Sequence, residues 1–357
     1  MIQAPRKSNK MEQPRVEAKK KPKAVFVLGA TATGKSKLAV AIAKRFDGEV
    51  INADKIQVHD GVPVITNKVT EEEMAGVPHH LLGVLPADAE FTAEDFRREA
   101  GQAVDRVLAA GRLPVVAGGS NTYVEELVDG DGAAFRRAHD VLFVWVDAAP
   151  ELLWWYTALR VDDMVVRGLV DEARNAFLDV GGEAADYARG VRRAIGLPEM
   201  HAYLLAEREG AGEEELAGML ACAVQEIKDN TFGLAQAQVA KIQRLSTLEG
   251  WDVRRIDATP VFARMAESGA TACDKQAWES LVWEPCEAMV RRFLETTSPA
   301  APVVTVEDNA SIAAGGGGSD GEPTNDAVAP GADGDGGVSS DDRNASIVTV
   351  SKVEDTI

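Results

Sequence analysis

Cysteine is scarce in this chain, and long apolar runs are absent. Only three cysteines occur in 357 residues, they are widely spaced, and no C-x-x-C pair is present. Disulfide frameworks and zinc clusters need paired or closely spaced thiols, so neither is expected, and a reducing compartment fits the composition. The sequence also has no secretory apolar segment and no run long enough to cross a bilayer. We expect a cytoplasmic protein with no membrane partner, and the plastid is the alternative location.

Positive charge is also in short supply. The sequence has 38 Lys and Arg residues against 57 Asp and Glu residues, which gives a formal net charge of −19. A protein that binds an RNA or DNA backbone needs a basic stripe, and none is obvious here. Free nucleotides need only a few local cations. The charge balance therefore favours a small phosphate-bearing partner over a nucleic acid. The oligomeric state stays open, and a monomer is compatible with the sequence.

The two ends of the chain differ in composition from its middle. Residues 1–23 carry eight Lys and Arg against two Glu, and Ala, Gly, Ser, Asp and Pro dominate residues 298–357. Such segments bury too little apolar surface to offset the entropy cost of ordering, so we expect both to be disordered. Residues 24–297 are long enough for one domain with a substantial core.

The most specific motif is the octapeptide GATATGKS at residues 29–36, which matches G-x-x-x-x-G-K-[ST]. A strand-like apolar run precedes it at 24–28, and a helical pattern follows it. In such a loop the backbone N–H groups surround a polyphosphate, the lysine adds positive charge, and the hydroxyl binds Mg²⁺. The sequence therefore predicts a phosphate site with Ser36 as the Mg²⁺ ligand, formed by Gly29, Ala30, Thr31, Ala32, Thr33, Gly34, Lys35 and Ser36.

Apolar strand-like runs alternate with helical patterns around this loop. We expect strands at 24–28, 49–53, 113–117, 141–146 and 251–256, and helices at 35–46, at 93–110 with Thr92 and Asp95 as a cap, and over most of 150–247. Continuous apolar strands separated by helices indicate a parallel sheet covered on both faces. The predicted fold class is α/β. It comprises a P-loop NTPase-like parallel sheet flanked by helices at 24–149, with a mostly helical C-terminal half or inserted helical subdomain at 150–247.

Polar residues follow three of these strands, at the edge of a parallel sheet where ligands bind. Asp54 can bind Mg²⁺, accept a proton or cap the next turn. Asp147 ends an apolar strand as a Walker B aspartate does, and a simple turn residue fits that position equally well. Gly118, Gly119 and Ser120 form the third strand end.

The helical half offers cations, and the segment near residue 80 offers imidazoles. Arg192 and Arg193 suit phosphate oxygens, which a guanidinium binds bidentately, although solvated surface arginines are common. His79 and His80 are a weak metal pair because adjacent residues do not share a face. No GTPase N-K-x-D, dinucleotide fingerprint or nucleophile elbow is present. Phosphoryl transfer, transfer with a diphosphate leaving group and nucleotide-dependent switching all stay open.

Eight segments in one order resemble the isopentenyltransferases, and specifically the plant adenylate type that makes cytokinin precursors. They fall between about residues 23 and 259 and read VFVLGATATGKSKLAV, INADKIQVHDGV, TNKVTEEEMAGVPHHLLG, FTAEDFRREA, VVAGGSNTYVEELV, RVDDMVVRGLVDEAR, YARGVRRAIGLPEM and GWDVRRIDAT. The resemblance implies an enzyme that transfers the dimethylallyl group from dimethylallyl diphosphate to the N6 amine of adenine. ADP and ATP are the implied acceptors, AMP is a further candidate, and diphosphate is released in this first step of cytokinin biosynthesis.

The resemblance also implies a role for each site residue. The phosphate loop would hold the diphosphate of the prenyl donor, Asp54 would accept the N6 proton, and Thr31 would position the amine. Lys35, Arg160 and Mg²⁺ at Ser36 would stabilise the charge that grows on the leaving diphosphate. The remaining implied diphosphate-binding and nucleotide-binding residues are Gly118, Gly119, Ser120, Arg192 and Arg193.

The chain departs from the family pattern in three places. Ala237 stands where plant relatives usually have the arginine of C-R-Q, and Asp163 stands where a lysine usually follows R-V-D. Both changes remove a cation, which puts the choice of acceptor in doubt. The acidic segment beyond residue 298 has no recognised counterpart. None of these departures touches the phosphate loop or Asp54.

Three other interpretations stay open. A tRNA dimethylallyltransferase performs the same chemistry on an anticodon loop, but it would favour serine at the position of Lys55, and the acidic charge disfavours tRNA. A small-molecule kinase needs only the phosphate loop and Asp147, and it would form a phosphorylated product without a prenyl donor. A non-catalytic nucleotide-binding protein is supported only by the missing cations, and it would tolerate loss of the Asp54 carboxylate.

Overall fold

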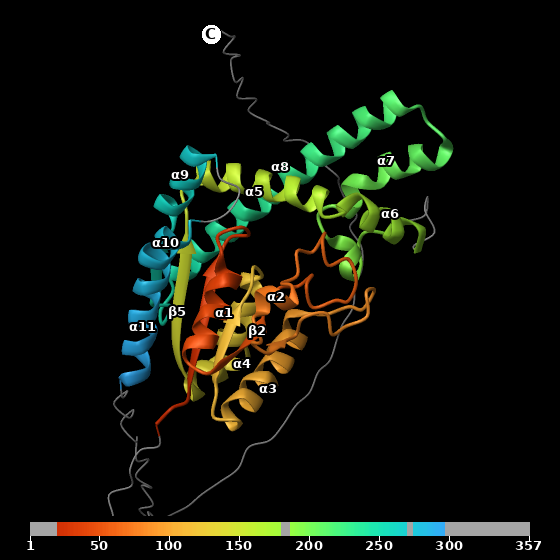
Figure 1. Ribbon diagram of the computed structural model, residues 1–357. Helices are drawn as coiled ribbons and strands as arrows, with labels where there is room; N and C mark the ends of the chain where they lie inside the picture. The colour runs from red at the N-terminus through yellow and green to blue at the C-terminus, as the bar shows by residue number, and fades with distance from the viewer. Residues whose placement is uncertain (1–19, 180–185, 270–273, 297–357) are drawn as a thin grey trace, which may run out of the picture. The chain divides into compact units, whose positions relative to one another are not determined.

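The computed structural model describes residues 20–179, 186–269 and 274–296 (Figure 1). The acidic segment expected to be disordered lies outside these residues. Of the basic N-terminal segment only residues 20–23 are described, and Lys23 already belongs to the first strand. Within the described ranges, no helix combines the length and the apolar character that crossing a membrane requires.

Six parallel strands form the central sheet. They are β1 (Lys23–Gly29), β2 (Gly48–Asn52), β3 (His79–His80), β4 (Leu113–Ala117), β5 (Asp140–Asp147) and β6 (Val253–Asp257). Their order across the sheet is β3-β2-β4-β1-β5-β6. β1 lies in the interior of the sheet, where Val25 is opposite Val115 of β4 and Leu142 of β5. The predicted fold class is confirmed, and the first four predicted strands are each right to within one residue at either end. The two-residue β3 was not predicted.

Helices connect the strands and cover the sheet. They are α1 (Lys35–Arg45), α2 (Glu71–Met74), α3 (Ala93–Ala109), α4 (Asn121–Ala138), α5 (Pro150–Val166), α6 (Leu169–Asp179), α7 (Leu197–Glu209), α8 (Glu213–Ser246), α9 (Thr259–Ser268), α10 (Lys275–Trp278) and α11 (Glu284–Glu295). A 3₁₀ turn, η2 (Gly190–Arg193), precedes α7, and a π-helical turn, η3 (Glu279–Trp283), joins α10 to α11. Thr92 and Asp95 form the predicted capping box of α3. The helices α2 and α4 and the helices from Thr259 onward were not predicted.

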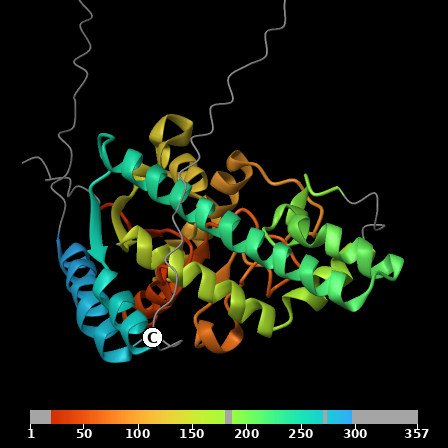
Figure 2. The ribbon, with the colours of Figure 1, turned by 90° about the horizontal axis from the view of Figure 1, so that it is seen from above.

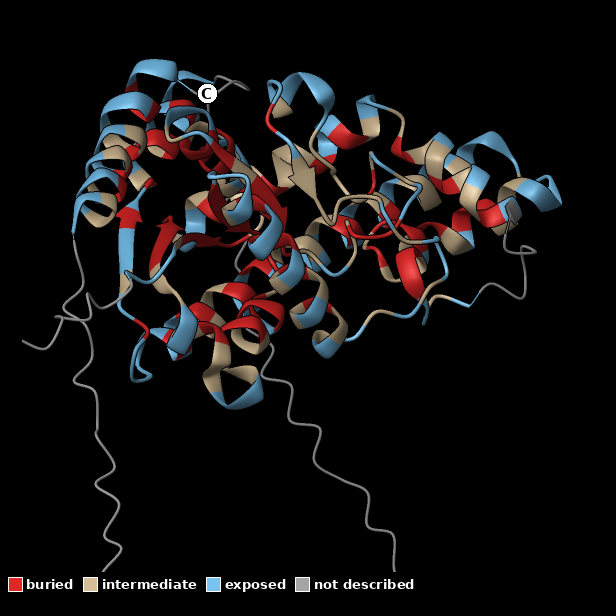
Figure 3. Cartoon of the chain, turned by 90° about the horizontal axis from the view of Figure 1, so that it is seen from below, coloured by how far each residue is buried: buried red, intermediate tan, exposed pale blue. Residues whose placement is uncertain are grey.

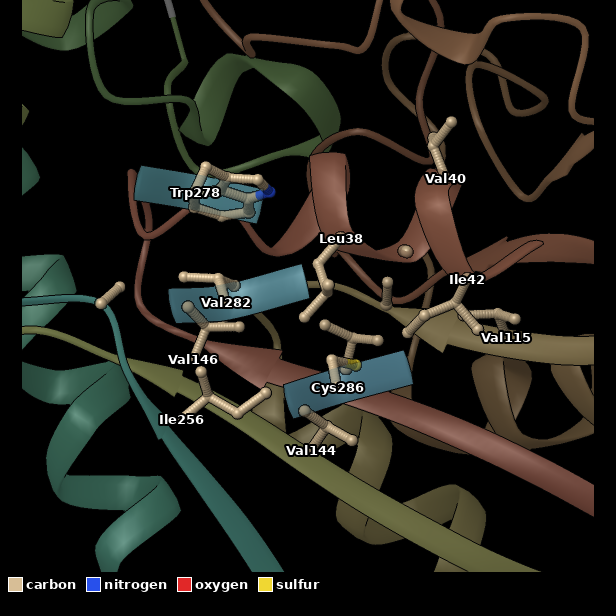
Figure 4. Packing of buried hydrophobic residues seen from close by; sticks show 14 of the residues in the cluster. Leu38, Val40, Ile42, Val115, Val144, Val146, Ile256, Trp278, Val282 and Cys286 are labelled. Carbon is tan, nitrogen blue, oxygen red and sulfur yellow. The ribbon is translucent and has the colours of Figure 1, made fainter. Parts of the chain in front are cut away.

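Alternate side chains of each strand enter two separate cores. In β1, Val25 and Val27 pack with α1 and the C-terminal helices, whereas Phe26 and Leu28 pack with α3 and α4. A strand buried on both faces has no polar side, which explains the continuous apolar run at 24–28. Figure 3 shows the buried strands between helices that expose their outer surfaces. Figure 4 shows the first core at close range.

The helices α5 to α8 form a lobe beyond the carboxyl ends of the strands, and α5 and α8 run side by side within it (Figures 1 and 2). A third buried cluster joins this lobe to the segment at 56–65. The end of α8 returns to the sheet, because Ile242 and Leu245 are buried in the core with α3 and α4. The predicted, mostly helical character of 150–247 is confirmed for the described residues of that range, and buried contacts fix the lobe against the carboxyl edge of the sheet.

The turn after β4 leads to a prediction about stability. A Cβ on Gly118 would lie 2.2 Å from the carbonyl carbon and oxygen of Ala53, so the two backbones approach too closely for any side chain. We expect Gly118→Ala to lower the free energy of unfolding by about 2 kcal/mol, because both backbones must shift. Gly101→Ala in α3 is the control, since nothing lies within 4 Å of its Cβ, and it should stabilise the protein by about 0.5–1 kcal/mol. Urea unfolding measures both, and equal effects would contradict the steric argument.

Candidate active site

The phosphate loop joins β1 to α1 and is tightly folded. The carbonyl oxygen of Ala30 accepts hydrogen bonds from the Thr33 hydroxyl at 2.9 Å and from Lys35 Nζ at 3.2 Å. Ala32 and Gly34 have φ values of 69° and 87°, which turn the chain sharply before α1 begins. The first N–H groups of α1 have no partner within the helix, and this end of the helix attracts anions. The loop therefore has the form that the sequence predicts for a phosphate site.

A tryptophan from the C-terminal helices lies against this loop. A Cβ on Gly34 would lie 2.4 Å from Cη2 of Trp278, so the indole excludes any side chain at position 34. Trp278 is only 5% exposed, and Lys37 Nζ lies 4.5 Å from a ring centroid of the indole. Figure 4 shows Trp278 in line with Val282 and Cys286, which pack toward α1 and the sheet. The C-terminal helices thus support the loop, a contact that no local sequence pattern revealed.

Thr31 connects the phosphate loop to the helical lobe. Arg160 of α5 donates a hydrogen bond from Nη1 to the Thr31 hydroxyl at 3.3 Å. The backbone N–H of Thr31 donates to Oε1 of Gln238, on α8, at 2.6 Å. Arg160 and Thr31 were both predicted as site residues, and the structure brings them together.

Gln238 was not predicted as a site residue. The sequence did contain a signal for its burial, because Gln238 lies at helical spacing between Ala235 and Ile242 on the buried stripe of α8. A polar residue on such a stripe is buried and needs hydrogen-bond partners.

Asp54 follows β2 and has one carboxylate oxygen in a turn. Its Oδ1 accepts backbone N–H bonds from Ile56 at 2.9 Å and Gln57 at 3.2 Å. The other oxygen, Oδ2, lies 3.4 Å from the point that a Cβ on Gly119 would occupy. The capping role considered for Asp54 is therefore real. It uses one oxygen and leaves the other beside the turn after β4.

The turn at Gly118–Ser120 holds the Asp54 segment in place. The backbone N–H of Ser120 donates to the carbonyl of Ala53 at 3.0 Å, and the Ser120 hydroxyl accepts from the N–H of Lys55 at 2.9 Å. The missing side chain of Gly118 permits the close approach of these backbones. The structure thus gives this turn a positioning role, and its predicted role in binding phosphate stays a prediction.

Two partly buried cations, Lys35 and Arg160, lie at the phosphate loop. Burial and, to a smaller extent, the charge of nearby Arg160 lower the pKa of Lys35 to about 8, while the charge of Asp54 opposes the shift. Burial also lowers the pKa of Arg160. Two cations held close together out of water are an unfavourable arrangement unless an anion joins them. The electrostatics therefore favour a phosphate-bearing ligand at Thr31, Lys35 and Arg160.

The predicted pair Arg192 and Arg193 lies in η2, which precedes α7. Arg193 Nε donates to the carbonyl of Gly190 at 3.2 Å. Burial raises the pKa of Tyr123 in the first turn of α4, and the charge of Arg193 opposes that rise. Among the described residues, no hydrogen bond joins either arginine to the phosphate loop. Their role toward acceptor phosphates stays a prediction.

Two other polar candidates have structural partners. Asp147 is 8% exposed and accepts a hydrogen bond from Arg255 Nε of β6 at 2.7 Å, so it joins the ends of two strands. His80 pairs through Nε2 with Glu49 at 2.5 Å, and His79 Nδ1 lies 2.9 Å from the carbonyl oxygen of Val77. These contacts favour the structural interpretation of Asp147 over a Mg²⁺ ligand.

These features together define a class: an α/β protein that binds a phosphate-bearing ligand beside a carboxylate, at the carboxyl edge of a parallel sheet. A family model described as IPP transferase matches residues 57–139 and 131–244. The chain is 45% identical to adenylate isopentenyltransferase 3, chloroplastic, of Arabidopsis thaliana, over 82% of this chain and 85% of that protein. It is 40% identical to the adenylate isopentenyltransferase of Humulus lupulus, over 75% and 89% of the two chains. The chain belongs to the adenylate isopentenyltransferase family.

Solved structures agree with this fold. The tRNA isopentenylpyrophosphate transferase of Bacillus halodurans has a TM-score of 0.57 at 26% identity, over 77% of this chain and 99% of that one. A eukaryotic dimethylallyltransferase that acts on tRNA has a TM-score of 0.63 at 21% identity, over 79% and 81% of the two chains, and shares the fold.

The lowered pKa of Lys35 leads to a prediction about pH. Dimethylallyl diphosphate should bind best while Lys35 is protonated, because the ammonium faces the anion. The last ionisation of a phosphate ester has a pKa near 6, so it is about nine-tenths complete at pH 7, where the relevant window begins. With a pKa of about 8 for Lys35, the affinity should fall about tenfold between pH 7 and pH 9.

Calorimetric titration of the protein with this ester measures the change. Lys35→Arg is the matched control, because arginine stays charged throughout, and its affinity should change little over the same range. A flat profile for the unaltered protein, or the same decline in Lys35→Arg, would contradict the assignment.

Proposed function

We propose that this protein transfers the dimethylallyl group from dimethylallyl diphosphate to the N6 amine of adenine in a free nucleotide, with ADP or ATP as the preferred acceptor. One observation carries the proposal. The phosphate loop and one free oxygen of Asp54 lie at the same sheet edge, and a single side chain, Gln238, contacts both the loop and Gly119 beside Asp54. A leaving-group site and a base are what this reaction needs.

The loop is suited to the leaving diphosphate. Lys35 and Arg160 supply positive charge, and the N-terminus of α1 supplies backbone N–H groups. As the bond from the prenyl carbon to the diphosphate oxygen breaks, negative charge grows on that oxygen. Fixed cations nearby stabilise this charge without reorganisation, so the loop acts on the transition state as well as on the bound donor.

Asp54 is suited to the base. The lone pair of an exocyclic adenine amine is delocalised into the ring, so the amine is a poor nucleophile until its proton is taken. The free oxygen of Asp54 would accept that proton as the new carbon–nitrogen bond forms, while the other oxygen keeps the carboxylate fixed in its turn. The Thr31 hydroxyl, held by Arg160, would orient the amine.

We propose that Mg²⁺ assists at Ser36. This residue is exposed in the first turn of α1, next to Lys35. One hydroxyl together with phosphate oxygens and water is a donor set that Mg²⁺ accepts. When bound, the ion would add positive charge against the leaving diphosphate.

Sequence similarity and charge both favour a free nucleotide over tRNA as the acceptor. Adenylate isopentenyltransferases of plants match at 35–46% identity, whereas tRNA dimethylallyltransferase 2 of Arabidopsis thaliana matches at 28%. The two positions where a family cation is missing lie on the surfaces of α8 and α5. Ala237 is exposed on α8, and Asp163 is largely exposed and pairs with Arg167 at 3.0 Å.

We also propose a plastid location. Adenylate isopentenyltransferases 3 and 5 of Arabidopsis thaliana are named chloroplastic, although number 7 is named mitochondrial. These names support the alternative location over the cytoplasmic one, which stays an untested prediction.

Mass spectrometry tests the reaction directly. The protein is incubated with dimethylallyl diphosphate, Mg²⁺ and equal amounts of AMP, ADP and ATP, with unmodified tRNA in a parallel sample. Prenylated ADP and ATP should appear, and their ratio ranks the acceptors. Prenylated tRNA alone would favour the tRNA enzyme. A phosphorylated product formed without the prenyl donor would favour a kinase.

Loss of the base gives the next prediction. Asp54→Asn keeps an oxygen that can accept the N–H bonds of Ile56 and Gln57, so the turn should fold. We expect kcat for prenyl transfer to fall by about 10²–10⁴-fold, while the Kd for the donor changes less than about twofold. Asp47→Asn is the control, because Asp47 is exposed and its positive φ suits asparagine. A near-normal rate in Asp54→Asn would exclude the carboxylate as the base.

A further inference from the structure

Gln238 is a polar side chain buried where α8 crosses the ends of β1 and β4. It is only 8% exposed, although its neighbours Gln236 and Ala237 on the same helix are exposed. Burying an amide costs free energy unless each end finds a partner. Both ends of Gln238 do so. Oε1 accepts from the N–H of Thr31 at 2.6 Å, and Nε2 donates to the carbonyl of Gly119 at 3.1 Å.

These two partners belong to the two halves of the site. Thr31 lies in the phosphate loop after β1, and Gly119 lies in the turn after β4 that is bonded to the Asp54 segment. Oδ2 of Asp54 lies 3.4 Å from the Cβ position of Gly119. One side chain thus spans the distance between the loop and the residues beside the base. A third hydrogen bond holds α8 beside the start of α4, because Asn121 Nδ2 donates to the backbone oxygen of Gln238 at 3.3 Å.

The chemistry of this position requires glutamine. Thr31 offers a donor and Gly119 offers an acceptor, so the bridging group needs an acceptor at one end and a donor at the other, which the planar amide provides. A carboxylate would set a second acceptor against the Gly119 carbonyl, and methionine would offer neither strong group. A side chain at position 119 would displace this amide, because a Cβ there would lie 2.3 Å from Nε2 of Gln238.

We propose that Gln238 is a positioning residue for the transfer reaction. It holds the phosphate loop and the Asp54 turn in register, so that the donor carbon and the acceptor amine meet in a reactive geometry. This inference rests on the proposed function. Gln238 itself need not touch the reacting atoms. Because alignment matters most in the transition state, loss of the bridge should lower kcat more than it weakens donor binding.

The first test compares Gln238→Met with Gln236→Met. Methionine matches glutamine in length but makes no comparable bridge, and Gln236 is an exposed residue two positions earlier on α8. We expect Gln238→Met to lower kcat at least about tenfold, with KM for dimethylallyl diphosphate within about threefold. Gln236→Met should leave both unchanged. Gln238→Glu, which keeps the Thr31 bond, should also lose kcat and provides a second variant if methionine prevents folding.

The second test separates bridging from space filling. Gly119→Ala forces a methyl group against the Gln238 amide, and Gln238→Ala removes that amide. If the bridge matters, each single variant and the double variant should have similarly low kcat, because both changes break one interaction. If Gln238 only fills space, the double variant should recover kcat relative to Gly119→Ala, because loss of the amide removes its clash with the new methyl group.

The outcomes distinguish this inference from the proposed function. No prenylated nucleotide from the unaltered, folded protein would overturn the proposed function. Two results with an active unaltered protein would overturn the role of Gln238. One is a kcat within about twofold of the unaltered value in folded Gln238→Met and Gln238→Glu. The other is full recovery of kcat in the double variant. The role of Gln238 would be supported if its variants had a reduced kcat with a nearly constant KM, and if the losses of kcat in Gly119→Ala and Gln238→Ala did not add in the double variant.

Discussion

Parallel pairing of β1 with β4 and β5 is the constraint on which the rest of the site depends. Parallel strands end at the same edge of a sheet, so the phosphate loop after β1 and the turn after β4 must lie close together. β2 pairs with β4 in the same direction, which brings Asp54 to this edge. Gly118 permits the final close approach to Ala53. The lobe of α5 and α8 then covers the edge with Arg160 and Gln238.

The electrostatic arrangement explains how an acidic protein can bind an anion. The net charge of −19 is a property of the whole chain, whereas the cations that matter are few and partly buried. Lys35 and Arg160 lie where water is limited, so their charges act more strongly on a bound phosphate than exposed lysines would. A long nucleic acid would need a broad basic surface. A diphosphate ester needs only this local group of cations.

The parts predictable from sequence were those with a local physical signature. The loop at 29–36 combines glycine conformation, a lysine and a helix start, and Thr92 and Asp95 form a cap within one turn. Asp54 was predictable as a carboxylate at a strand end. The sequence did not reveal that Oδ1 accepts the backbone bonds of the turn while Oδ2 lies beside Gly119. Gln238 contacts Thr31 and Gly119 over more than a hundred residues, and Trp278 reaches Gly34 from the C-terminal helices. Such contacts depend on tertiary packing, which no short window of sequence encodes.

The central claim is that the phosphate loop holds the leaving diphosphate of the prenyl donor, with the adenine amine at Asp54. A crystal structure with ADP and an unreactive thio analogue of dimethylallyl diphosphate tests it most directly. The account predicts that the diphosphate of the analogue lies against Lys35 and Ser36 and that adenine N6 lies within hydrogen-bond distance of Oδ2 of Asp54. Nucleotide phosphates in the loop, with the adenine distant from Asp54, would contradict the account.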